Sequence, residues 1–166
     1  MTFRGLFCFV TLSLILSIST TIRAQEMTSK SGQNVTEMTF TNVPGLPTCT
    51  VGSVQNGDPT KGPSIIFAKM EAGCVIPWHW HTASENLMMV SGVARIEMKD
   101  GKPMTLGAGG YARMPSRHVH QFRCEQACSL YVYSDAAFDI HYIDAQGKEI
   151  SVEDALKSTL KKKPGR

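Results

Sequence analysis

The sequence predicts an all-β protein, built as one antiparallel barrel or sandwich with a short helix at its C-terminal end. The chain has 166 residues, which is enough for one well-buried core and too few for two ordinary domains. Its 14 glycines and 8 prolines provide for many tight turns. Between these turns, short β-prone runs recur at even intervals, which is typical of barrels and sandwiches.

The first 24 residues differ from the rest and are predicted to be a signal peptide. Arg4 supplies positive charge, residues 5–18 form an uncharged and mostly apolar run, and small residues precede Ala24. An uncleaved membrane anchor is the alternative, but this run is shorter than the roughly 20 residues that a spanning helix needs. Both interpretations predict export. We therefore expect a secreted or periplasmic protein with no stable membrane span after cleavage.

Loss of this leader leaves a nearly neutral protein. It removes Arg4 and Arg23 and no acidic residue, so the formal charge falls from +3 to +1. Such a balance gives no electrostatic reason to expect nucleic acid, and the basic run at residues 161–163 is interpreted as a solvated tail. We expect a small molecule as the partner.

The remaining chain divides into an arm, a barrel and a C-terminal segment. Residues 25–45 begin with a polar stretch that predicts a mobile arm or an edge strand. The barrel is expected over residues 46–145, with strands at 48–54, 64–70, 86–90, 93–99, 102–106, 111–114, 118–123, 129–134 and 138–142. Residues 146–166 predict a helix, with Ser151 as N-cap and Asp154 in the capping-box position, followed by the basic tail.

Four cysteines follow the leader, and an even number in an oxidising compartment allows two disulfides. Cys124 and Cys128 are separated by three residues between two predicted strands, so they could face each other across a hairpin. Cys49 and Cys74 would then form the other pair. Four buried free thiols remain the alternative, because four cysteines allow three connectivities. A four-cysteine zinc site is not expected, since no CxxC pair occurs.

Four of the five histidines lie in two HxH pairs. Residues two apart on a strand point to the same face about 6 to 7 Å apart, so His79 and His81 can direct both imidazoles at one point. Glu85 can return a carboxylate to this face, and His120 would complete the set from a distant strand. Three imidazoles and a carboxylate predict one divalent transition metal, with Fe or Mn favoured and Zn, Ni or Cu as alternatives. An octahedral metal would keep two open positions, whereas a tetrahedral zinc would be filled and structural.

At these residues the sequence resembles the cupin superfamily. Its first motif is a glycine, five residues, HxH, three or four residues, a glutamate, six residues and a glycine. Every fixed position is matched from Gly73 through His79, His81 and Glu85 to Gly92.

The second cupin motif is matched by Gly109, Pro115 and His120, with two departures. Arg117 stands where the motif has glycine, and Cys124 stands where it has asparagine. The ligand position is intact, but the loop conformation is expected to differ.

The resemblance covers roughly residues 64–142 and implies a double-stranded β-helix, the cupin jelly-roll barrel, often assembled as a homodimer. Cupins include dioxygenases, manganese enzymes acting on oxalate, sugar isomerases and non-enzymatic binding domains, so the fold does not fix the reaction. We favour a dioxygenase-like oxidoreductase in which Glu85 is a metal ligand or a catalytic base. A binding or sensing module without turnover is the alternative. An isomerase or epimerase is less favoured, since nothing marks a sugar or nucleotide-phosphate site.

Three further residues are candidates for substrate contact. Arg117 could hold an anionic group with its planar fork, although exposed arginines are common. His118 shares a strand face with His120 if the segment is regular, but a bend after Pro115 would turn it to solvent. Met89 is an even number of residues from Glu85, so it would also point inward on a regular strand. It could line an apolar pocket, or only fill the core.

Overall fold

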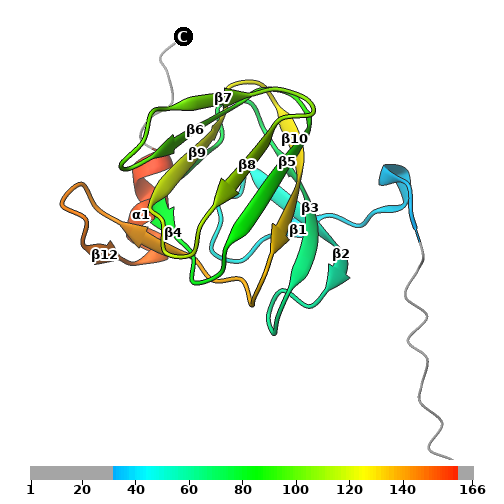
Figure 1. The fold of residues 1–166 in the computed structure, drawn as a ribbon, viewed down its shortest axis with the longest axis horizontal. Helices are drawn as coiled ribbons and strands as arrows, with labels where there is room; N and C mark the ends of the chain where they lie inside the picture. Colours follow the sequence, from blue (N-terminus) through cyan, green and yellow to red (C-terminus); the bar gives the residue numbers. More distant parts are fainter. Residues whose placement is uncertain (1–31, 161–166) are drawn as a thin grey trace, which may run out of the picture. The chain divides into compact units, whose positions relative to one another are not determined.

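The structure, a computed structural model, describes residues 32–160 of the chain (Figure 1). The predicted signal peptide, the beginning of the arm and the basic tail lie outside these residues. Strands dominate the described part, with a 3₁₀ turn at Val35–Glu37 (η1) and one helix at Val152–Leu160 (α1). This arrangement confirms the all-β class and the C-terminal helix. No helix within residues 32–160 is long and apolar enough to cross a membrane.

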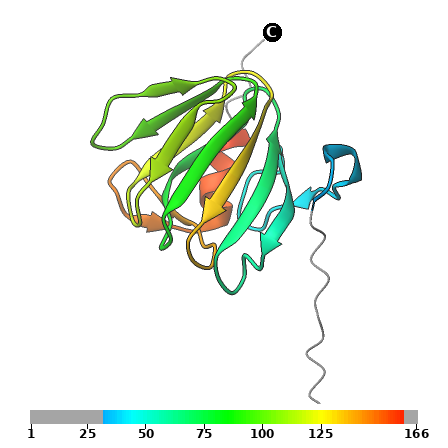
Figure 2. The same ribbon diagram turned by 45° about the vertical axis from the view of Figure 1, so that its right-hand side comes forward.

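Two six-stranded antiparallel sheets make up the barrel, and Figures 1 and 2 show them facing each other. The first sheet has the order β1 (Thr41–Asn42), β2 (Thr50–Gly57), β3 (Ser64–Met70), β10 (Cys128–Ser134), β5 (Glu85–Ser91) and β8 (Tyr111–Met114). The second has the order β12 (Glu149–Ile150), β11 (His141–Ile143), β4 (Val75–Trp80), β9 (His120–Cys124), β6 (Ala94–Met98) and β7 (Met104–Leu106). Strands distant in sequence are therefore neighbours, as in a jelly roll.

Alternation along the strands explains the barrel interior. Glu85, Leu87 and Met89 of β5 are all buried, as residues two apart on one strand face should be. The core continues through Ile96 and Phe122, which are at most 3% exposed. Helix α1 contacts β4 and β11 and buries Ala155 against them, so it covers the second sheet.

Gly92 shows why the first motif ends in glycine. Its φ is 77°, in the left-handed region that favours glycine, and an added Cβ would lie 2.1 Å from the carbonyl oxygen of Ala127. Any side chain at this position would push the β5–β6 turn away from the start of β10.

The strand predictions were wrong at several places, and the predicted strands did not include β1, β4 or β12. Residues 118–119 and 138–140 are not strand, and β2 continues through Asn56 and Gly57 because these residues pair with Ile65 and Ser64 of β3. Residues 138–140 leave the sheet because the Phe138 amide donates to the carbonyl of Pro59, 2.8 Å away, instead of a ladder partner. Alternation of Phe138 and Ile140 was therefore misread as a strand.

The structure contains both cysteine pairs as disulfides, Cys49–Cys74 and Cys124–Cys128. The first ties the start of β2 to the turn before β4. The second joins β9 to β10, which belong to different sheets.

Candidate metal centre

Four predicted ligands meet inside the barrel. His79 lies near the end of β4, His81 follows that strand, His120 begins β9 and Glu85 begins β5. All four residues are at most 5% exposed. Because His79 is the register partner of His120, the two strands bring histidines 41 positions apart into contact.

A bulge in β4 aims the histidine pair inward. Ile76 and His79 both line the interior cavity although they are an odd number of residues apart. A regular strand would point them to opposite faces, but the pairing of β4 with β9 shifts register between these two residues. The extra residue resets the alternation, so His79 and His81 face the cavity.

Each imidazole is held by a backbone carbonyl. Nδ1 of His79 donates to the carbonyl of Pro77 at 2.6 Å, and Nδ1 of His120 donates to that of His118 at 2.9 Å. Nδ1 of His81 donates to the carbonyl of Asp139. A carbonyl can only accept, so the proton of each neutral ring is on Nδ1 and Nε2 keeps its lone pair. Such carbonyl contacts typically orient metal-binding histidines.

The three histidines form a compact cluster whose ligand atoms lie within 4.8 Å of one another. Burial lowers the pKa of His79 well below the ordinary value, and neighbouring His120 and His81 lower it further. Burial also lowers the pKa of His120, to about 4, although its hydrogen bond to the His118 carbonyl opposes this effect. These two imidazoles are therefore neutral near pH 7, which is the form that binds a metal.

Glu85 adds a carboxylate to this cluster. Its Oε2 lies 3.2 Å from Nε2 of His81. Burial raises the pKa of this carboxyl group, and the nearby His81 opposes the rise. With the His81 proton on Nδ1, two lone pairs face each other across this short distance, an arrangement that needs a proton or a cation between them. The donor set thus fits a divalent transition metal held by His79, His81 and His120 with Glu85 beside them.

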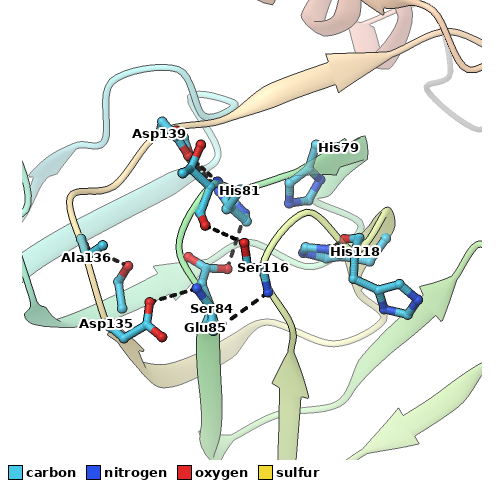
Figure 3. A network of polar contacts seen from close by, with 12 residues as sticks. His79, His81, Ser84, Glu85, Ser116, His118, Asp135, Ala136 and Asp139 are labelled. Atoms are coloured by element: carbon cyan, nitrogen blue, oxygen red, sulfur yellow. Dashed lines mark hydrogen bonds and ion pairs between the residues drawn. The ribbon is translucent and has the colours of Figure 1, made fainter.

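Loop contacts fix the start of β5 (Figure 3). The Ser84 amide donates to Asp135 at 2.8 Å, and the Thr82 amide donates to Asp139 at 2.7 Å. From the other side, the Ser116 hydroxyl donates to the Thr82 carbonyl at 2.6 Å. The turn between His81 and Glu85 is therefore held by two segments far away in the sequence.

An interior cavity of about 70 Å³ opens beside the histidines. Apart from the four candidate ligands, its wall is mostly aliphatic and aromatic; it includes Val43, Leu46, Ile66, Ala68, Met70, Leu87, Phe122, Leu130, Val132 and Phe138. The Phe138 ring lies 5.2 Å from that of His81, measured between ring centroids. The candidate metal position is therefore in contact with an apolar chamber.

Comparison with known protein families gives one match, to the family described as "Cupin domain", over residues 66–133. This range includes His79, His81, Glu85 and His120. The chain carries a cupin domain. No curated protein matches it in sequence.

Solved structures show the same fold. The polyketide cyclase RemF from Streptomyces resistomycificus is similar with a TM-score of 0.63 and 17% identity, over 78% of this chain and 92% of the cyclase. An RmlC-like cupin from Shewanella frigidimarina has a TM-score of 0.54 and 15% identity, over 65% and 91%. The DMSP lyase DddQ from Ruegeria pomeroyi has a TM-score of 0.51 and 18% identity, over 68% and 60%.

Arg117 shows how this cupin accommodates the missing glycine of the second motif. Its φ is 59°, so an arginine adopts the left-handed backbone that glycine favours. Its amide donates to the His81 carbonyl at 2.8 Å, which links the second motif to the first. Its guanidinium lies 5.1 Å from the centroid of the Trp80 ring, and Trp80 stacks on His141 with ring centroids 3.8 Å apart.

None of the three candidate substrate contacts is part of the cavity wall in the described cupin domain. Arg117 is exposed beside Trp80, and Met89 is buried in the core. His118 is half-buried, and its Nδ1 has no hydrogen-bond partner among the described residues. The main contact of His118 with the centre is its carbonyl, which accepts from His120.

Several residues that matter at the site were missed from the sequence. Asp139 and Asp135 hold the loop before Glu85 from 50 or more positions away, and no local pattern marks them. Ser64 and Ser134 line the cavity. The period-2 pattern of their strands could have placed them on the inward face.

Proposed function

We propose that the protein binds one divalent transition metal through His79, His81 and His120, with Glu85 as the fourth ligand. We further propose that it acts there as a dioxygenase-like oxidoreductase on a small, largely apolar molecule. This proposal rests on one observation: three imidazoles bring their ligand nitrogens close together on the wall of an apolar cavity. Its predicted signal peptide supports a secreted or periplasmic location. A homodimer remains a prediction from the cupin resemblance.

Each group at the proposed site has a separate role. An iron or manganese ion would supply open coordination positions at which a substrate and dioxygen can react. Backbone carbonyls keep the imidazoles in one tautomer and orientation, so the ligand set is preorganised. Glu85 would be the fourth ligand or would hold a proton on its carboxyl group, because burial raises the pKa of this group and so favours its neutral form. Apolar walls exclude water from the reacting groups.

The structural neighbours support an enzymatic role for the fold. RemF is described as a polyketide cyclase and DddQ as a DMSP lyase. At 17% and 18% identity they do not indicate a reaction for this chain.

A metal-dependent binding module without turnover is the second candidate. Glu85 is the only carboxyl group among the described residues that line the cavity, and none of these residues is a lysine, tyrosine or cysteine. Proton transfer would thus depend on one group that is also a candidate ligand.

Metal analysis of the purified chain tests the centre, with His120→Ala as the decisive variant. We expect one metal per chain in the wild type and almost none in His120→Ala, because that substitution removes one of three converging nitrogens. His118→Ala is the matched control, since His118 is not part of the three-histidine cluster and its backbone carbonyl remains. Stoichiometric metal in His120→Ala would refute the site.

Oxygen uptake then separates the two candidate functions. Protein loaded with Fe(II) or Mn(II) is mixed with catechols, and oxygen consumption is followed. Uptake that disappears in His120→Ala supports the oxidoreductase. Full metal occupancy without uptake for any redox metal contradicts it and favours the binding module.

A further inference from the structure

The inward rows of three adjacent strands change from polar to apolar along the barrel. On β3 the row is Ser64, Ile66, Ala68 and Met70; on β10 it is Ser134, Val132 and Leu130; on β5 it begins with Glu85 and Leu87. All of these residues line the cavity. Each row thus has its polar member at the end of the barrel where the histidines lie.

Strand register places these three polar residues side by side. Ser134 is the register partner of Ser64 on one side and of Glu85 on the other. Because neighbouring strands are about 4.8 Å apart, the Ser64 and Glu85 backbones are separated by roughly 10 Å. A polar row therefore leads across the cavity wall from the metal centre to Ser64.

The Ser64 hydroxyl is the unpaired member of this polar row within the described residues. Ser64 is 4% exposed, and its Oγ has no hydrogen-bond partner among the described residues. Ser134 differs, because its hydroxyl donates to the carbonyl of Ala136 at 3.0 Å. Burying a hydroxyl without a partner is unfavourable, so such a group commonly marks a place where another polar atom binds.

We propose that Ser64 is a second binding point for the substrate, at which its hydroxyl donates to an oxygen atom of the ligand. One end of the ligand would bind at the histidine centre, its apolar body would contact Ile66, Leu87 and Val132, and its other oxygen would reach Ser64. This inference rests on the proposed metal-dependent function. It defines the substrate as a small, mostly aliphatic or aromatic molecule with two separated oxygen functions.

The side chains of the cavity wall also indicate which kind of oxygen-containing group can bind at Ser64. Within residues 32–160, no lysine or arginine lines the cavity. A carboxylate or phosphate at Ser64 would lose its hydration without gaining an opposite charge, which is strongly unfavourable. The group at Ser64 is therefore a neutral hydroxyl or carbonyl, and dicarboxylates and phosphorylated compounds are disfavoured.

Three ligands of equal chain length test this assignment: pentanoate, 5-hydroxypentanoate and glutarate. Their carboxylate binds the metal, and their far ends are a methyl group, a hydroxyl group and a second carboxylate. Affinities are measured by calorimetry on Mn(II)-loaded full-length wild type, Ser64→Ala and Ser53→Ala. Ser53 is the matched control because it is buried at 6% exposure on β2 and does not line the cavity.

We expect wild type to bind 5-hydroxypentanoate about 3- to 10-fold more tightly than pentanoate, the effect of one hydrogen bond between uncharged groups. Ser64→Ala should lose this preference without weaker binding of pentanoate, Ser53→Ala should keep it, and glutarate should bind most weakly. Equal ratios in wild type and Ser64→Ala, or no binding of any probe to metal-loaded protein, would overturn the assignment while the metal centre stands. Metal analysis of the same samples identifies the separate outcome in which no metal binds, which overturns both proposals.

Discussion

Arg117 carries a quantitative prediction about backbone strain. A non-glycine residue in the left-handed region costs roughly 1 to 2 kcal/mol, whereas glycine adopts it freely. Glycine also has more conformational freedom to lose on folding, which offsets roughly 0.5 to 1 kcal/mol of that relief. With φ at 59°, replacing Arg117 by glycine should therefore give a protein about 0.5 to 1 kcal/mol more stable than replacement by alanine.

This pair of variants isolates the backbone because both lose the same side-chain contact. The guanidinium over Trp80 contributes about 0.5 to 1 kcal/mol at an exposed site, so Arg117→Ala should be less stable than wild type by this amount and Arg117→Gly should be close to wild type. Urea denaturation with chelator present gives the free energies of unfolding without a contribution from bound metal. An alanine variant as stable as the glycine variant, with equal slopes, would refute the left-handed conformation of this residue.

Two further predictions concern pH and the disulfides. Burial lowers the pKa of His141, but its hydrogen bonds to Glu149 and Asp139 outweigh burial and raise the pKa overall. Its stabilising contribution is therefore complete below the unfolded-state pKa of about 6.5 and is lost as pH rises through the higher folded-state pKa. His141→Gln should consequently reduce the free energy of unfolding more at about pH 5.5 than at about pH 9, and the reverse order in urea titrations would contradict this assignment. The Cys49–Cys74 disulfide closes a loop with a sequence separation of 25, so replacing both cysteines by alanine should lower the melting temperature and cost about 3.5 kcal/mol. A melting temperature equal to that of the wild type would show that the bond contributes nothing.

Most of the fold was predictable because it depends on local alternation. The strands at 64–70 and 111–114 were predicted with the bounds that the structure has, and the helix begins after its predicted N-cap. Ser151 acts as the expected N-cap, since its hydroxyl accepts from the Asp154 amide at 3.1 Å and donates to the Asp154 carboxylate at 2.7 Å. Strand predictions failed where tertiary contacts replace the hydrogen bonds between neighbouring strands. Phe138 alternates like a strand residue, but it lies in a loop against the cavity.

The histidine cluster was predictable from spacing and motif, whereas the residues that orient the histidines were not. Two HxH pairs and a glutamate mark the centre at the level of the sequence. The residue that orients His81 is Asp139, 58 positions away, and it acts through its carbonyl, which carries no sequence signal. The loop was expected to differ at Arg117, and this prediction was wrong, because Arg117 adopts the left-handed backbone conformation that glycine favours, with φ at 59°.

The sequence by itself determined the all-β class, the position of the helix and the set of residues that meets at the centre, because periodicity and motif spacing are local properties. Only the tertiary structure decided which residues surround that set. The bulge in β4, the carbonyl partners of the histidines and the row from Glu85 through Ser134 to Ser64 all depend on pairing between strands distant in sequence. Register across a sheet is fixed by the packing of the whole barrel, so no segment read alone contains it.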